Sequence, residues 1–140
     1  MTTDKNILQV MNQMGRNNMV HNLGIEFTHV TENSITAIMP VDERTKQPMG
    51  LLHGGATVAL AETIGSMGSE MMVDLKTKAI VGIEVNANHL KSAHNGKVEA
   101  IGTIIHKGKT THVWDVRVTN DKGQTVAICR ITILVIDKRN

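Results

Sequence analysis

The feature of the sequence that most constrains the fold is a long apolar segment in the middle of the chain, ATVALAETIGSMGSEMMV. The segment is too long for a typical strand and is rich in Ala, Leu, Met and Gly, so it predicts a helix from about residue 54 to residue 75. This helix is apolar nearly all the way round, and such a helix must be enclosed by the rest of the fold. The small residues that let neighbouring elements approach it closely are Gly54, Gly55, Ala56, Ala59, Ala61, Gly65 and Gly68.

Strand-like patterns lie on both sides of this helix. The segment GIEFTHVTENSITAIMP predicts two strands joined by a turn at Glu32 and Asn33, with Pro40 closing the second strand. After the helix come AIVGIEVNANHL, KVEAIGTIIH, THVWDVRVTN and QTVAICRITILVI, which the turn signals HNG, KGK and NDKG separate. Apolar and polar residues alternate around Trp114, as expected for an antiparallel strand with one buried face and one wet face.

These patterns predict an α+β fold, in which an antiparallel sheet of about six strands wraps around one long central helix. A short N-terminal helix is also expected, because Ile7, Leu8, Met11 and Met14 have helical spacing and Asp4 can cap them. The length suits a single domain over residues 1–140. A sheet of this kind leaves an open edge strand, and a second copy of the chain commonly covers such an edge.

Composition and charge exclude several classes of protein. Hydrophobic residues make up 41% of the chain and charged residues 20%, as in ordinary globular proteins. The fifteen Lys and Arg are scattered among thirteen acids without a basic stripe, so we expect no nucleic-acid partner. We also expect a cytoplasmic protein without a membrane partner, because no signal-peptide pattern and no run of eighteen apolar residues occurs. Cys129 is the only cysteine, which suits a reducing compartment, and we interpret it as a small apolar core residue.

A candidate catalytic site lies in the loop before the central helix and on the helix itself. Two glycines open the helix, where unpaired N–H groups and the positive end of the dipole favour an oxygen that gains negative charge. Gln47 and His53 precede Gly54 and could position a substrate or a water molecule. Glu62 is a lone acid on an apolar helix, so it must be paired, protonated or catalytic. Ser66 follows one turn later on the same face and could orient the Glu62 carboxylate.

Helix geometry then restricts how these residues can work together. Gly54 and Glu62 are eight residues apart, or roughly 12 Å along a straight helix. One carbonyl group cannot contact both of them within one chain. If both belong to one site, they must come from different chains, which predicts a homo-oligomer, at least a dimer, with equivalent sites.

The segments QPMGLLHGGATVALAETIGS and VGIEVNANHL resemble the hotdog-fold acyl-CoA thioesterases, a group that includes phenylacetate-pathway thioesterases, 4-hydroxybenzoyl-CoA thioesterase and 1,4-dihydroxy-2-naphthoyl-CoA hydrolase. The resemblance extends over about residues 14–136 and implies a hotdog fold. It implies that Glu62 is the nucleophile or general base and that the Gly54 N–H polarises the thioester carbonyl. Gln47 and His53 would position the carbonyl, and Ser66 would orient the attacking water. A dimer of dimers is the expected assembly.

The same resemblance implies a site for coenzyme A, which is part of the substrate and not a separate cofactor. The residues that it assigns to substrate or CoA binding are Val81, Asn88, His89, Leu90, Lys91, Ser92, Ile105, His106, Lys107, Gly108, Lys109 and Thr110. Lys91, Lys107 and Lys109 could meet the phosphates. The chain has Met49 where close aryl-CoA relatives often have Phe, so an aromatic acyl group would pack on Met and aliphatic side chains.

We predict no metal site, because His21, His29, His94 and His112 lack the spacing and acidic company of zinc ligands. The leading hypothesis is hydrolysis of aryl or medium-chain acyl-CoA to free acid and CoA. One alternative is a non-catalytic module that binds acyl-CoA or an acyl-carrier protein, since a fold does not fix a function. Another is a proofreading thioesterase acting on carrier-bound acyl groups. A hotdog hydratase would need an Asp/His pair, and none is visible beside Glu62.

Overall fold

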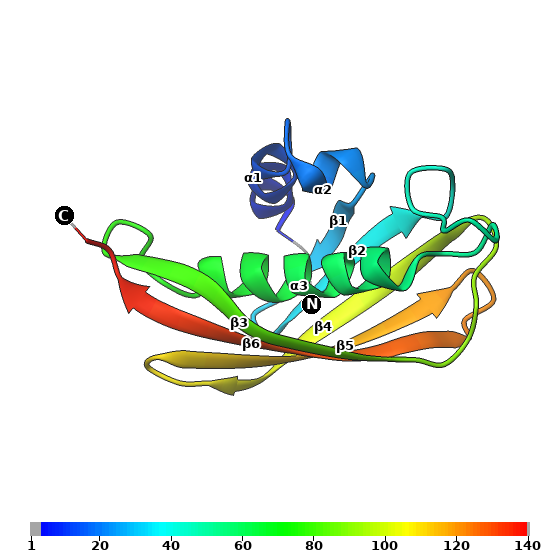
Figure 1. Cartoon of the computed structure of the whole chain (residues 1–140). Coiled ribbons are helices and arrows are strands. Elements are labelled where there is room, and N and C mark those ends of the chain that lie inside the picture. Colours follow the sequence, from blue (N-terminus) through cyan, green and yellow to red (C-terminus); the bar gives the residue numbers. More distant parts are fainter. Residues whose placement is uncertain (1–3, 140) are drawn as a thin grey trace.

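The computed structural model describes residues 4–139 and shows one curved sheet with a long helix lying across its concave face (Figure 1). Two short helices at the start of the chain lie on the other side of that helix. The helices are α1 (Lys5–Met14), α2 (Met19–Asn22) and α3 (Gly54–Glu70). The strands are β1 (Glu26–Val30), β2 (Ser34–Pro40), β3 (Lys78–His89), β4 (Lys97–Lys107), β5 (Thr111–Asn120) and β6 (Thr125–Asp137).

The six strands form a single antiparallel sheet in the order β1-β2-β4-β5-β6-β3. The prediction of an α+β fold with about six strands and one long helix is therefore confirmed. β1 and β3 are the edges of the sheet in a single chain. β3 pairs with β6 along its whole length, from Lys78 to His89. The register of this pairing shifts between Gly82 and Glu84, where β3 bulges. The irregular stretch thus lies on an edge strand beside α3.

Glycines bring α3 and the sheet close together, as predicted for Gly65 and Gly68. A β-carbon at position 68 would lie 2.4 Å from the Trp114 ring, and one at position 65 would lie 3.0 Å from Ile131. On the sheet side, Gly102 of β4 leaves room for Ile64 of α3 in the same way. The core formed here is dense: Leu60, Ile64, Trp114 and Ile131 are fully buried.

The sheet does not enclose α3 on every side, which corrects the expectation drawn from its apolar composition. The face toward the sheet is buried, including Ala61 and Ile64, whereas Ala59, Glu62 and Ser66 are only half-buried. The physical reason is that the sheet curves over one side of the helix only (Figure 1). The other side of α3 faces the segment that carries α1 and α2.

The predicted N-terminal helix is present and is fixed to the sheet. The Asp4 side chain accepts hydrogen bonds from the N–H groups of Asn6 and Ile7, which confirms the predicted cap. Farther along α1, the Asn12 side chain donates to the Phe27 carbonyl at 3.0 Å and accepts from the Phe27 N–H at 2.8 Å. This pair of bonds ties α1 to β1 and so holds the end of α1 and the chain that follows it above α3.

The central helix ends at Glu70, five residues before the predicted end. A tight turn follows in which the Asp74 carbonyl accepts hydrogen bonds from the N–H groups of Thr77 and Lys78. The Asp74 carboxylate also accepts from the N–H of Lys76. Asp side chains that bond to nearby backbone compete with helix formation, so the apolar run continues past the point where the helix stops.

Candidate active site

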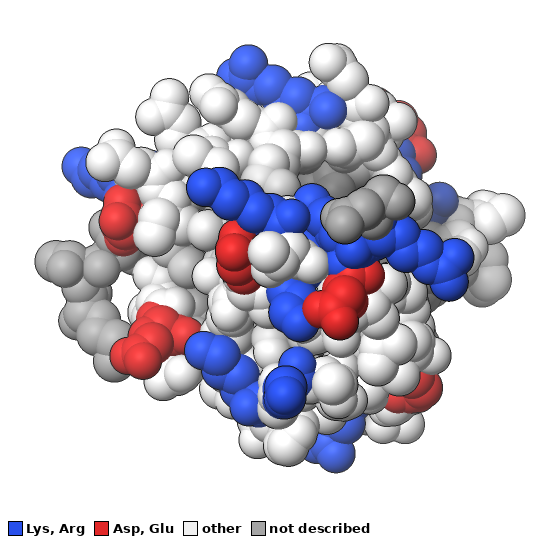
Figure 2. Space-filling view, turned by 90° about the vertical axis from the view of Figure 1, so that its left-hand side faces the viewer, with Lys and Arg blue, Asp and Glu red and all other residues white. Residues whose placement is uncertain are grey.

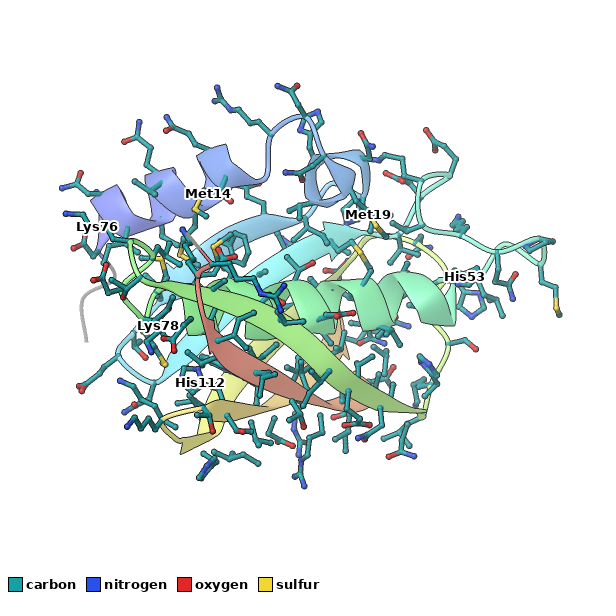
Figure 3. All side chains as sticks on the ribbon, turned by 60° about the vertical axis from the view of Figure 1, so that its left-hand side comes forward. Met14, Met19, His53, Lys76, Lys78 and His112 are labelled. Atoms are coloured by element: carbon teal, nitrogen blue, oxygen red, sulfur yellow. The ribbon has the colours of Figure 1, made fainter. Side chains whose placement is uncertain are left out.

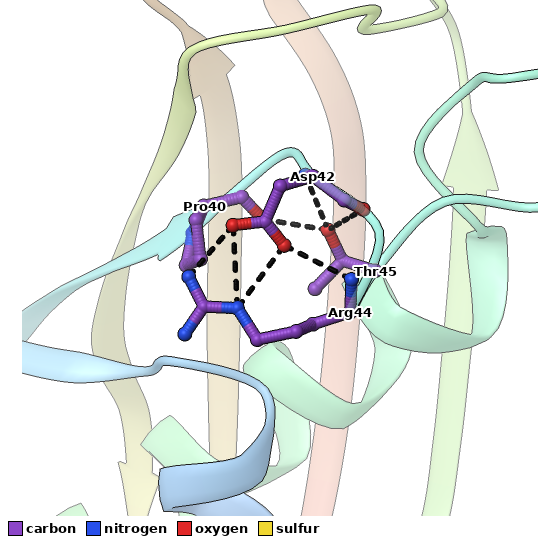
Figure 4. Close-up of polar contacts among 4 residues, drawn as sticks. All are labelled: Pro40, Asp42, Arg44 and Thr45. Atoms are coloured by element: carbon purple, nitrogen blue, oxygen red, sulfur yellow. Dashed lines mark hydrogen bonds and ion pairs between the residues drawn. The ribbon is translucent and has the colours of Figure 1, made fainter.

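The loop between β2 and α3 carries Gln47 and is held in one conformation by its own side chains. The Arg44 guanidinium donates to both carboxylate oxygens of Asp42, at distances from 2.7 to 3.2 Å (Figure 4). Thr45 is buried and its hydroxyl donates to the Pro40 carbonyl at 2.6 Å. The Gln47 N–H then donates to the Leu51 carbonyl at 2.8 Å, which closes the loop tip. These contacts place Gln47 before any substrate arrives.

His53 caps the start of α3. Its Nδ1 atom accepts a hydrogen bond from the Gly55 N–H at 2.7 Å, and the backbone N–H of His53 donates to the Thr45 carbonyl. Within residues 4–139 the N–H of Gly54 has no acceptor, so it remains available at the positive end of the helix. The His89 ring lies beside it, because a β-carbon at position 54 would be 3.0 Å from His89 Nε2.

A pocket of about 430 Å³ surrounds the start of α3. The pocket is lined by six of the predicted site residues, which the structure thus brings together: Gln47, Gly54, His89, Leu90, Lys91 and Ser92. The Gln47 Oε1 atom accepts from the Met49 N–H within the loop, which leaves the amide nitrogen as its free donor. His53 is exposed at the border of this region, and Asn88 immediately precedes His89 on β3.

Glu62 and Ser66 lie in a different pocket, also of about 430 Å³, between α3 and the α1–α2 segment. Most of its lining residues are apolar and three of them are methionines; we call it the Glu62 groove. It is lined by Met14, Met19, Val20, Leu23, Ala59, Glu62, Thr63, Ser66, Met67 and Glu70. Figure 3 shows Met14 and Met19 on the side of α3 that faces away from the sheet, and His53 at its start.

The Glu62 side chain reaches the edge of the sheet. A β-carbon at Gly82 of β3 would lie 2.7 Å from Glu62 Oε1, so the absence of a side chain there makes room for the carboxylate. No hydrogen bond joins Glu62 to Gln47 or Ser66 among the residues that the structure describes. The simple explanation of Glu62 as a hydrogen-bonded structural acid is therefore not supported by contacts of this kind.

The two halves of the predicted site are separate within one chain. The Gln47 and Gly54 pocket and the Glu62 groove have no lining residue in common. Along α3, Gly54 and Glu62 are eight residues apart, or roughly 12 Å. The structure thus retains the separation that the sequence predicts, and a single carbonyl cannot contact both groups in one copy.

The residues assigned to CoA by resemblance also divide into two groups. Asn88 to Ser92 adjoin the Gly54 pocket, whereas Val81 pairs with Leu134 at the other end of β3. The Val135 N–H donates to the Thr110 carbonyl, which places the turn between β4 and β5 at that same end. Figure 2 shows this end of the molecule, with Lys and Arg side chains spread across it and acids among them. Ile105, His106, Lys107, Gly108 and Lys109 belong to β4 and this turn.

A buried polar cluster lies near the end of α3, away from both pockets. The Ser69 hydroxyl oxygen accepts from Trp114 Nε1 at 2.9 Å and lies 3.0 Å from His112 Nδ1. His112 is 2% exposed; its burial, with Lys107 and His106 nearby, lowers the pKa of the imidazole. His112 is therefore a buried, hydrogen-bonded histidine. Over residues 4–139 no cluster of three or more His, Cys, Asp or Glu has the geometry to hold a metal ion.

Comparison with known proteins identifies the family. Residues 49–127, more than half of the chain, match the family model of the thioesterase superfamily. The chain belongs to the thioesterase superfamily. It is 43% identical to the 1,4-dihydroxy-2-naphthoyl-CoA hydrolase of Escherichia coli K12, over 92% of this chain and 94% of the relative. It is 40% identical to the proofreading thioesterase EntH of Klebsiella pneumoniae, over 92% and 93%.

The solved structures agree with this assignment. The crystal structure of a mutant of thioesterase PA1618 from Pseudomonas aeruginosa superposes with a TM-score of 0.92 at 46% identity, and the match covers 99% of this chain and 97% of that one. This thioesterase-superfamily chain is therefore a hotdog-fold thioester hydrolase. In the part of the chain that the structure describes, no helix is long and apolar enough to cross a membrane.

Proposed function

We propose that this thioesterase hydrolyses acyl-CoA with aryl or medium-chain acyl groups, and that two chains form each active site. The carrying observation is Glu62, an acid without a hydrogen-bond partner among residues 4–139, set in a methionine-rich groove beside the edge strand β3. A carboxylate without a partner in such a groove lowers stability, so its presence there favours a functional role. The groove suits an apolar acyl group, because methionine side chains adapt to rings and alkyl chains.

In the proposed reaction, Glu62 attacks the thioester carbonyl carbon or removes a proton from the water that attacks it. The Gly54 N–H of the other chain stabilises the oxyanion, and the Gln47 amide positions the carbonyl. His53 holds the start of the helix through Gly55, and Ser66 orients the water. If water attacks, the C–S bond then breaks, CoA leaves as the thiol after protonation, and the acyl group leaves as the carboxylic acid. If Glu62 attacks, the same C–S bond breaks to leave an acyl–Glu62 anhydride, and water then hydrolyses this anhydride to the carboxylic acid and restores the Glu62 carboxylate. The reaction consumes one water and uses no other cofactor.

The edge strand β3 supports the pairing of two chains. Among residues 4–139 of a single copy, no strand pairs with its outer edge, and Val81 and Ile83 are 41% and 55% exposed. Unpaired strand edges with exposed apolar residues favour association with a second copy. Pairing at β3 would bring the partner chain to the side of α3 where Glu62 meets Gly82. In such an assembly, Lys91 beside the Gly54 pocket could bind one phosphate of a CoA molecule. Lys107 and Lys109, at the turn between β4 and β5, could bind another phosphate of the same molecule.

Release of free thiol from benzoyl-CoA and octanoyl-CoA tests this proposal. The wild-type protein should release CoA from both thioesters, and Glu62→Ala should lower turnover by about three orders of magnitude while the fold is retained. Glu62→Gln, which keeps the shape but cannot act as a base, should be almost as inactive. Near-normal turnover in either folded variant would remove Glu62 from the chemistry.

The same thiol-release assay also tests two alternative functions. A module that only binds acyl-CoA or an acyl-carrier protein would release no thiol, although it would still bind CoA thioesters. A thioesterase that acts on carrier-bound acyl groups, a reading consistent with the likeness to proofreading thioesterase EntH, would prefer the carrier thioester to the CoA thioester. Measuring kcat/KM for the same acyl group on CoA and on a carrier domain separates these possibilities.

A further inference from the structure

The Glu62 groove contains a second acid that the proposed reaction does not use. Glu70 lies eight residues after Glu62 on α3, with Ser66 between them, so the three side chains follow one another along the same side of the helix. The separation of the two acids is roughly 12 Å along the helix axis. Glu70 thus stands at the far end of the groove from the carboxylate assigned to the reaction.

The surroundings of Glu70 do not explain why an acid is placed there. Its side chain is half-buried, and within residues 4–139 it forms neither an ion pair nor a side-chain hydrogen bond. Burial raises the pKa of Glu70, as expected for a carboxyl group between apolar walls. Those walls include Met14, Met19 and Met67. An apolar residue at this position would avoid the free-energy cost of burying an unpaired carboxyl group.

We infer that Glu70 selects acyl groups by their far end: it favours acyl groups that carry a hydroxyl or amino group there and rejects those that carry a carboxylate. This inference rests on the proposed function, because it takes Glu62 as the position of the thioester. A hydroxyl or amine can donate a hydrogen bond to the Glu70 carboxylate, and such charge-assisted bonds are the strong ones. A carboxylate would meet like charge from the half-buried Glu70, which disfavours its binding.

The methionine walls and Glu70 contribute differently to substrate specificity. Methionine is flexible and tolerates rings or chains of different shape, so the walls set little specificity. A site built to bond a polar group discriminates far more strongly against an analogue that lacks it. Short acyl groups cannot bridge the roughly 12 Å between the two acids, so the selection applies only to long or extended acyl groups.

Three thioesters of equal length test the inference: octanoyl-CoA, 8-hydroxyoctanoyl-CoA and the CoA thioester of octanedioic acid. For the wild-type protein, kcat/KM should be about tenfold higher for the hydroxylated chain than for the plain chain, and lowest for the carboxylated chain. Glu70→Leu should reverse the order of the first two. Glu70→Gln should improve the carboxylated substrate most, because an amide can donate to a carboxylate.

The control variant is Glu99→Gln, which removes an exposed acid from β4 on the outer face of the sheet and should keep the wild-type order. Circular dichroism and melting temperature confirm that each variant is folded. Hydrolysis of octanoyl-CoA by the wild-type protein reports on the proposed function, and the ratio between substrates reports on Glu70. The inference is overturned if the ratio of hydroxylated to plain substrate is the same in wild type, Glu70→Leu and Glu70→Gln.

Binding provides a second readout that does not need turnover. The affinities of the same three thioesters for Glu62→Gln and for Glu62→Gln with Glu70→Leu can be compared by calorimetry. We expect the preference for the hydroxylated chain in the first protein and its loss in the second. If the ratio of affinities for the hydroxylated and the plain thioester were the same in the two proteins, the role of Glu70 would be overturned, even if no hydrolysis were observed.

Discussion

The carboxylate of Glu62 occupies the space that a side chain at Gly82 would take: a β-carbon there would lie 2.7 Å from Oε1. The contact joins the central helix to the bulged part of edge strand β3. Glu62 is therefore directed toward the edge at which we propose that a second chain pairs. The position of the acid depends on the missing side chain of a residue twenty positions later in the sequence.

Gly82→Ala should therefore displace the carboxylate and lower kcat/KM by about ten- to a hundredfold, since small misplacements of a reacting group are costly. The melting temperature should change little, because the clash involves the flexible end of a side chain and position 82 lies on an exposed strand. Thiol release and thermal unfolding of the same preparation measure the two effects.

A double-mutant comparison controls for indirect effects of Gly82→Ala. In the background of Glu62→Ala, the added methyl group has no carboxylate to displace, so it should cause no further loss of residual activity. A further loss of similar size in that background would show that Gly82→Ala acts through some other contact.

The buried His112 should make stability depend on pH. Its pKa in the folded protein lies below the ordinary 6.5, so the unfolded chain binds the proton more readily than the folded chain does. The contribution to stability is complete above about pH 6.5 and declines as the pH falls toward the folded pKa. Urea midpoints at pH 7.5 and pH 5.5 should differ more for the wild type than for His112→Gln, which cannot titrate. Equal differences would mean that another group controls this pH range.

Cys129 should be inert in the native protein. It is 2% exposed on β6, and burial together with the nearby Asp115 raises the pKa of its thiol to about 11. The reactive thiolate is therefore scarce at pH 8, and access to it is blocked. Ellman's reagent should detect no thiol in the folded protein and one per chain in guanidinium chloride. Rapid reaction of the native protein would contradict the buried position of Cys129.

Most of the fold could be predicted from the sequence because its signals are local. The alternation around Trp114 and the turn signals located the strands, and the length of the apolar segment located α3. The short helix α2 was not predicted, since its four residues are held by the Asn18 cap and by contacts with the rest of the fold. The end of α3 was placed too late because the hydrogen bonds of Asp74 outweigh the apolar pattern of the segment.

The candidate site was predictable only in part. Helix geometry alone placed Gly54 and Glu62 too far apart to share a carbonyl, and the two separate pockets agree with this. The capping bond of His53 could be anticipated from its position before the two glycines, although the sequence suggested a role toward substrate. The contact between Glu62 and Gly82 could not be predicted, because it depends on the register and bulge of β3.

Mixing two inactive variants tests most directly whether, as we propose, each active site needs two chains. One variant carries Glu62→Ala; the other carries Gln47→Ala with Gly54→Pro, which removes the backbone donor. After subunit exchange, each mixed dimer has one site with both damaged halves and one intact site. Thiol release should return to about half the wild-type value per mixed dimer. If mixed dimers verified by mass spectrometry stay as inactive as their parents, Glu62 works with donors of its own chain and the two-chain site is wrong.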